Sequence, residues 1–70
     1  MNKLMLRKLA TRIKDLRKSK NYTQDELSFR ANIARSTLGN IETSQNDVTF
    51  SKVCSIAKAF DMTLAEFLNF

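Results

Sequence analysis

Residues 23–44, TQDELSFRANIARSTLGNIETS, constrain the fold of this chain more than any other stretch. Apolar or small residues recur there at helical spacing in two short runs, first at Leu27 and Ala31 and then at Leu38 and Ile41. The few residues between the two runs leave room only for a tight turn. The stretch therefore predicts a helix-turn-helix, in which two short helices are joined by a sharp turn.

Helical patterns on both sides of this motif complete an all-α prediction. Upstream, apolar residues spaced by three and four mark one face of a first helix that ends near residues 20 and 21: Leu6, Leu9, Ile13 and Leu16. Downstream, a fourth helix after Thr49 is expected to turn these residues inward: Phe50, Val53, Ile56, Ala57 and Phe60. A short fifth helix follows, and we expect one domain over residues 1–70.

Capping patterns predict where several helices begin and end. Thr23 and Glu26, and later Thr63 and Glu66, have the spacing of capping boxes for the second and fifth helices. The third helix, about residues 35–43, lacks a capping side chain because an alanine precedes it, at a cost of about 1 kcal/mol.

Charge is unevenly distributed along the chain, whose formal net charge is +5. Residues 1–35 carry ten Lys or Arg against three acidic residues, whereas residues 36–70 carry two against four. A basic surface in one half suits a polyanionic partner.

Composition argues against several other classes of protein. The chain has no histidine and one cysteine, Cys54, which we expect to be a small buried thiol. No metal site and no nucleophile with its base can be recognised, so we expect neither an enzyme nor a cofactor nor a small-molecule ligand. No apolar run approaches the roughly 20 residues of a membrane span, and we expect a cytoplasmic protein without a membrane partner.

The motif, with RANIARSTLGNIE at its centre, resembles the DNA-binding domain of the Cro/cI/Xre repressor family, and the resemblance extends from about Leu9 to Phe67. It implies a compact five-helix lambda-repressor-like fold and a sequence-specific DNA-binding transcriptional regulator. Arg35 and the NDVTF stretch make the chain most similar to the controller proteins of restriction-modification systems. Such a regulator would control its own promoter or a restriction-modification operon. A phage Cro-like repressor stays an alternative.

In a helix-turn-helix, the second helix of the motif lies in the major groove with its N-terminal side chains on base edges. Arg35 is then expected to donate two hydrogen bonds to a guanine. The other residues expected to reach bases are Ser36, Thr37 and Asn40. Five residues are expected to contact phosphate: Gln24, as the resemblance implies, and Thr43, Ser44, Asn46 and Arg12.

Arg17 lies one turn after Ile13, at the edge of the apolar stripe of the first helix, where a partly solvated charge needs a partner. Glu42 holds the matching position beside Leu38, and the family pairs an arginine and a glutamate at these places. We therefore predict a structural ion pair between Arg17 and Glu42.

Family members usually bind paired half-sites about 34 Å apart as homodimers. The C-terminal FLNF has more apolar surface than one short helix can bury, which predicts a dimer interface of Phe67, Leu68 and Phe70, with core packing as the competing use of Phe67. A protein-interaction module, such as an antitoxin or adaptor, is the alternative function. It would bind its partner through Phe29 and the C-terminal aromatic residues. Otherwise we expect Phe29 to pack along the flank of its helix.

Overall fold

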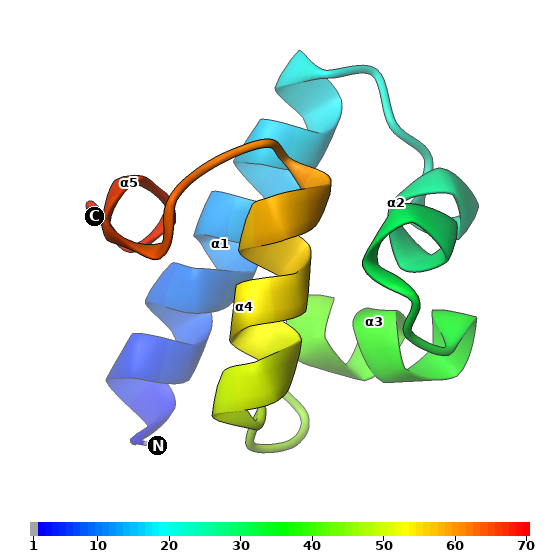
Figure 1. The fold of residues 1–70 in the computed structure, drawn as a ribbon. Helices are drawn as coiled ribbons and strands as arrows, with labels where there is room; N and C mark the ends of the chain where they lie inside the picture. Colours follow the sequence, from blue (N-terminus) through cyan, green and yellow to red (C-terminus); the bar gives the residue numbers. More distant parts are fainter. Residues whose placement is uncertain (1) are drawn as a thin grey trace.

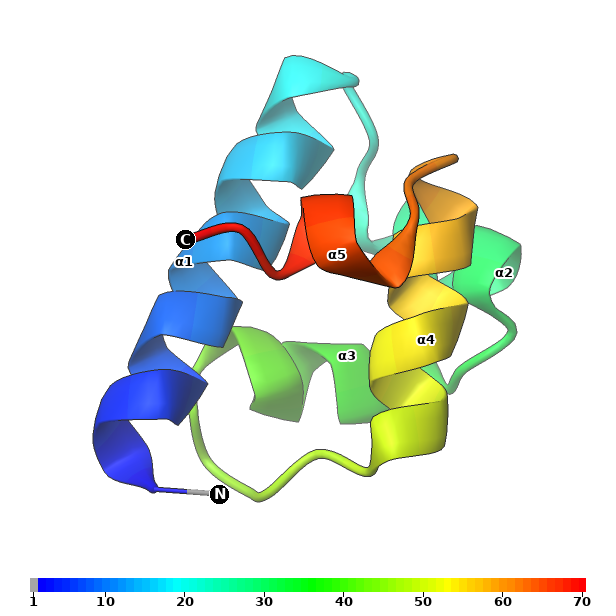
Figure 2. The ribbon, with the colours of Figure 1, turned by 60° about the vertical axis from the view of Figure 1, so that its left-hand side comes forward.

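The computed structural model describes residues 2–70, which form five helices and contain no strand. The helices are α1 (Lys3–Ser19), α2 (Gln24–Ala31), α3 (Arg35–Glu42), α4 (Phe50–Ala59) and α5 (Leu64–Phe67). The all-α prediction is confirmed. α2 packs on α3 and α4, α3 packs on α1, and α5 packs on α4. Figure 1 shows the α2–α3 pair on one side of α4 and α5 on the other, and in Figure 2 the C-terminus ends beside α1.

Each helix contributes to the core, which lies between them. The largest fully buried side chains are Leu9, Ile13, Leu27, Leu38, Ile56, Phe60 and Phe67. Burial of a side chain of this size stabilises the fold by roughly 1.5–3 kcal/mol. Because the apolar side of α3 is used in this way, its opposite side is left facing outward.

An aromatic stack links the connection between α1 and α2, the C-terminal end of α4, and α5. The ring of Tyr22 lies parallel to that of Phe60, with centroids 6.2 Å apart, and Phe67 lies 6.2 Å beyond Phe60 in a tilted arrangement. The guanidinium carbon of Arg30, on α2, lies 4.5 Å from the centroid of Tyr22, which places a cation over the Tyr22 ring.

Each of the first four helices is followed by a residue other than glycine with a positive φ. These residues are Asn21, Asn32, Ser44 and Asp61, with φ between 55° and 59°. Asparagine and aspartate tolerate this left-handed conformation better than most residues, because their side chains form local hydrogen bonds. The sharp helix junctions are therefore built without glycine.

Capping follows the sequence prediction at one of the two expected boxes. At α5, the Thr63 hydroxyl accepts from the Glu66 N–H and the Glu66 carboxylate accepts from the Thr63 N–H, at 3.1 and 2.8 Å. At α2, Thr23 accepts from the Glu26 N–H at 3.0 Å, but the Glu26 carboxylate instead lies 3.4 Å from Arg30 Nε. The capping box predicted there is half formed, since an arginine one turn later competes for the carboxylate.

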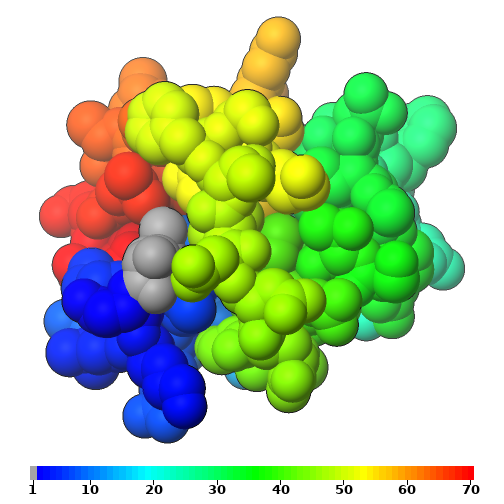
Figure 3. All heavy atoms as spheres, turned by 90° about the horizontal axis from the view of Figure 1, so that it is seen from below, coloured from blue at the N-terminus to red at the C-terminus, as the bar shows by residue number. Residues whose placement is uncertain are grey.

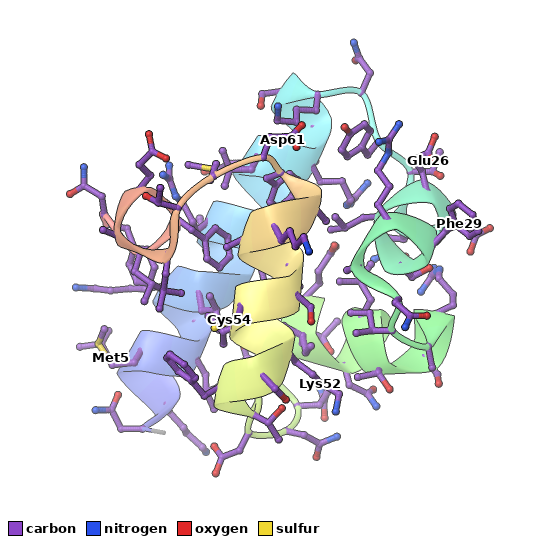
Figure 4. All side chains as sticks on the ribbon, in the orientation of Figure 1. Met5, Glu26, Phe29, Lys52, Cys54 and Asp61 are labelled. Atoms are coloured by element: carbon purple, nitrogen blue, oxygen red, sulfur yellow. The ribbon has the colours of Figure 1, made fainter. Side chains whose placement is uncertain are left out.

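Three side chains are more exposed than predicted. Phe50, expected to face inward, is 68% exposed because it begins α4, where a groove lined by Met5 and Phe70 takes the place of a packed helix. Phe29, expected along the helix flank, is 83% exposed and points away from the bundle (Figure 4). Cys54 is half-buried rather than buried.

Candidate nucleic-acid interface

The outer side of α3 brings together the four residues predicted to contact bases. Arg35, Ser36 and Asn40 are exposed and Thr37 is half-buried, while Leu38 is fully buried on the opposite side. The helical period explains this separation, since residues 36 and 40 lie one turn apart on the same face. Viewed from below, α3 and the loop after it form a continuous surface (Figure 3).

A buried carboxylate fixes α3 to the two preceding helices. Glu42 Oε2 accepts from Arg17 Nε at 3.0 Å, and Oε1 accepts from Arg17 Nη2 at 3.2 Å and from Gln24 Nε2 at 2.9 Å. The Glu42 side chain is only 2% exposed, and Arg17 also donates from Nη1 to the Tyr22 carbonyl at 3.0 Å. The predicted ion pair is present, and Gln24, predicted to contact phosphate, braces α2 against α3.

The guanidinium of Arg35 is held at the α2–α3 junction. Its Nε lies 3.1 Å from Oδ1 of Asp25, on α2, and the Arg35 side chain remains 49% exposed. A Cβ added at Gly39 would lie 3.2 Å from Arg35 Nη1, so the guanidinium lies over the glycine one turn later.

The loop after α3 carries three residues predicted to contact phosphate. Thr43 donates from its hydroxyl to the Gly39 carbonyl at 3.0 Å, and Ser44 donates to the Leu6 carbonyl at 3.5 Å. Asn46 is exposed. Thus the loop is tied back to α3 and to the start of α1, which lies beside it in Figure 3.

Sequence reasoning missed Lys52 as a component of this surface. Lys52 and Thr49, at the start of α4, line a cleft with Thr37 and Asn40 of α3 and with Asn46. Figure 4 shows Lys52 at the end of α4 that is near α3. The signal was present in the sequence, since a lysine three residues after a helix cap lies in the first helical turn, close to its free N–H groups.

The structure does not bring Arg12 to this surface. Its Nε donates to the Phe67 carbonyl at 3.0 Å, and its Nη2 donates to the Glu66 carbonyl at 2.8 Å. Arg12 therefore binds the C-terminal carbonyls of α5, where a cation is favoured, and ties that helix to α1. Its predicted phosphate contact lacks support in this arrangement.

A second exposed surface is apolar. An open groove has seven lining residues: Met5, Leu9, Val48, Phe50, Val53, Leu68 and Phe70. Leu68 and Phe70, both predicted interface residues, are 40% and 45% exposed. Phe67 is fully buried, so its predicted interface role is wrong, because its ring fills the core against Phe60. Met5 and Phe50 were missed, since only the fold joins the N-terminus and the start of α4 to the C-terminus.

None of the helices within residues 2–70 combines the length and apolar character that a membrane crossing requires.

Comparisons with known proteins agree with this geometry. The HTH_3 model, described as helix-turn-helix, matches residues 13–67. No curated protein sequence matches the chain.

Among solved structures, the chain is similar to the restriction-modification controller protein C.AhdI from Aeromonas hydrophila, with a TM-score of 0.84, 31% identity, and coverage of 89% of this chain and 94% of that chain. It is similar to the wild-type controller protein C.Esp1396I, with a TM-score of 0.86, 26% identity, and coverage of 96% and 90%. A chain of the SinR protein/SinI protein complex gives a TM-score of 0.79 and 27% identity, with coverage of 87% and 60%. The predicted similarity to controller proteins is confirmed.

Proposed function

Because the chain belongs to the HTH_3 helix-turn-helix family, whose members are DNA-binding transcription regulators, we propose that it binds a two-fold symmetric operator in double-stranded DNA as a homodimer. The observation that carries this proposal is the outer side of α3. There, one arginine and three small polar side chains face outward from a helix that a buried ion pair fixes in place.

The residues on α3 suit direct reading of bases in the major groove. Arg35 offers paired donors to guanine O6 and N7, which discriminates against other bases by roughly 1–3 kcal/mol. Asn40 suits the N6 and N7 atoms of adenine, and Thr37 suits the methyl group of thymine.

The surroundings of α3 suit contacts with the DNA backbone. The first turns of α2 and α4 present N–H groups at helix N-termini, which favour phosphate oxygens. Lys52 lies beside the cleft next to α3, and the polar loop with Asn46 continues the same surface. These contacts would set the register of the protein on the duplex, whereas the α3 side chains would select the sequence.

The apolar groove supports the homodimer. Met5, Phe50, Leu68 and Phe70 are each 37% to 68% exposed and border one surface, and aromatic residues with methionine are favoured at the centres of protein interfaces. A second copy of this chain would present the same groove across a two-fold axis, as a closed dimer requires.

Selection of bound sequences from a random duplex pool at near-physiological salt tests the proposal. Wild type, Arg35→Ala and Lys18→Ala are compared, since Lys18 is an exposed cation on α1 and its loss removes the same charge. We expect a two-fold symmetric motif that loses a guanine preference only in Arg35→Ala. Weak, salt-sensitive binding without an enriched motif would overturn the proposal, because it reflects general electrostatic attraction.

We also propose that the regulated promoter is its own or that of a restriction-modification operon, since two of the similar structures are restriction-modification controller proteins. Titration of the native upstream region against an unrelated duplex tests this step. Equal binding to both would contradict it, even if the selection yields a motif.

The exposure of Phe29 favours a second candidate function, a protein-interaction module such as an antitoxin or adaptor. An aromatic side chain that is 83% exposed has no packing role in the monomer. Its signature would be a protein partner whose binding is lost in Phe29→Ser, survives Arg35→Ala and is unaffected by DNA.

A further inference from the structure

We infer that Asp25 and Gly39 together orient Arg35 for guanine recognition, so that Asp25 is a specificity-determining residue although it lies on α2 rather than α3. This inference rests on the proposed function, because it concerns how the same surface reads a base. Asp25 acts through Arg35 and is thus a positioning residue.

The position of Asp25 follows from the packing of α2 on α3. It is the second residue of α2, and Arg35 is the first residue of α3, so the turn between the helices separates them along the chain. The hydrogen bond from Gln24 to Glu42 ties the start of α2 to the end of α3. The Asp25 side chain is 84% exposed, and its Oδ1 lies 3.1 Å from Arg35 Nε.

This contact determines which edge of the planar guanidinium remains available for DNA. A guanidinium has five N–H donors in a planar fork, one on Nε and two on each terminal nitrogen. With Nε directed at Asp25, the two terminal nitrogens are left to meet guanine O6 and N7 end on. An approach in which Nε itself contacts the base would require breaking the ion pair.

Gly39 supplies the space for this orientation. It lies inside α3 without a positive φ, so its backbone conformation does not require glycine. A Cβ at this position would lie 3.2 Å from Arg35 Nη1, which is tight for such a contact, and the flexible guanidinium would shift. The absence of a side chain at position 39 therefore leaves room for the Arg35 guanidinium in this orientation.

The charge of Asp25 adds to discrimination in a second way. A carboxylate beside the DNA surface repels phosphate, and Arg35 neutralises it while the two remain paired. Removal of the carboxylate should raise affinity for DNA in general and lower the preference for the correct base. Since exposed ion pairs shift equilibria only about two- to fivefold, we expect a change of that size in the preference.

The test compares the duplex selected by wild type with the same duplex in which the guanine·cytosine pair is replaced by adenine·thymine. The ratio of the two dissociation constants is measured for wild type, Asp25→Ala and Asp15→Ala. Asp15 is the matched control, an exposed aspartate on α1 that borders a hollow with Arg12 and Phe70. We expect the ratio to fall about two- to fivefold in Asp25→Ala and to stay unchanged in Asp15→Ala.

A double-mutant cycle separates positioning from general charge effects. In an Arg35→Ala background, Asp25→Ala should leave the ratio unchanged, because no guanidinium remains to be oriented. An unchanged ratio in Asp25→Ala alone, or an equal fall in both backgrounds, would overturn the inference.

Gly39→Ala provides an independent variant, in case Asp25→Ala folds poorly. It should lower the guanine preference without lowering the melting temperature, a combination that loss of structure does not produce. A retained preference would contradict the role of Gly39. If wild type selects no motif, the proposed function fails; if wild type selects guanine and the Asp25 and Gly39 variants keep it, only this inference fails.

Discussion

At Gly39, the absence of a side chain matters for the space that it leaves to a neighbouring residue and not for the backbone conformation of position 39 itself. It is the one glycine of the chain and lies in the middle of a regular helix, where glycine is disfavoured. The nearest feature that depends on its small size is the Arg35 guanidinium, whose Nη1 would lie 3.2 Å from an added Cβ. Helix stability therefore favours alanine at position 39, whereas the proposed orientation of Arg35 favours glycine.

We expect Gly39→Ala to raise the free energy of unfolding by about 0.5–1 kcal/mol, because alanine loses less backbone entropy in a helix. Urea unfolding monitored by circular dichroism measures this change. A destabilised variant would mean that the displaced guanidinium cannot find another position, contrary to its exposure of about one half.

Ala34 occupies the N-cap of α3 but provides no capping hydrogen bond. Its backbone, with φ −65° and ψ 143°, has the extended conformation of a capping residue, but alanine has no side-chain acceptor. We expect Ala34→Ser to stabilise the fold by about 1 kcal/mol, through a hydrogen bond to a free N–H of the first turn. Ala34→Val is the control in the same unfolding assay, since valine caps no better than alanine. Equal stability of the serine and valine variants would contradict this expectation.

At the scale of helices, the buried Glu42 carboxylate joins α1, α2 and α3. Arg17 comes from α1 and Gln24 from α2, so the carboxylate fixes the orientation of α3 against both helices. Periodicity and family resemblance could predict the Arg17 pair, because both residues lie at the edge of an apolar stripe. Periodicity alone could not show that Gln24 shares the carboxylate.

We expect Arg17→Ala to cost roughly 3–5 kcal/mol, because it leaves a buried carboxylate without its cation. Lys18→Ala removes the same charge from the exposed side of α1 and should change stability by less than about 0.5 kcal/mol. Chemical unfolding of both variants gives the comparison. If Arg17→Ala is too unstable to measure, Arg17→Lys serves in its place and should be less stable than wild type. An Arg17 variant as stable as wild type would refute the structural role of the ion pair.

The capping box of α5 makes part of its stability depend on pH. The Thr63 backbone N–H, and secondarily its hydroxyl, holds the pKa of Glu66 below its ordinary value. This stabilisation is complete above the pKa of an unfolded glutamate, about 4.3, and is lost as the pH falls through the lowered native value. Glu66→Ala should therefore melt below wild type at pH 7, with the gap narrowing in acid. A gap independent of pH would exclude a role for the charged carboxylate.

At the scale of the whole molecule, the sequence predicted the five helices, most of the core and the α3 surface, because each depends on residues close along the chain. Its errors concern places where distant segments meet. Phe50 fits an inward stripe by spacing but borders a groove, and Arg12, predicted to contact phosphate, binds the C-terminal carbonyls of α5. Lys52 joins the α3 surface only through the tertiary fold.

The groove also provides a prediction for assembly. We expect Phe50→Ser and Phe70→Ser to weaken the proposed homodimer, since each removes exposed aromatic area from the lining of the groove. Leu4→Ser is the matched control, because Leu4 is 61% exposed but does not line the groove. Sedimentation equilibrium gives the dissociation constants, and operator titration should show half-saturation at higher protein concentration for the two phenylalanine variants. A larger effect of Leu4→Ser would place the interface elsewhere.

The stacked position of Tyr22 provides an intrinsic fluorescence probe of the fold. The chain has no tryptophan and one tyrosine, so its tyrosine emission comes from a single ring, which lies in the connection between α1 and α2 and stacks on Phe60. Because the ring stacks on Phe60 and carries the Arg30 guanidinium over it, its near-ultraviolet circular dichroism reports on the native packing around Tyr22. DNA bases do not share the tyrosine emission, so the fluorescence of one unlabelled residue can follow whether the scaffold stays intact when the duplex binds.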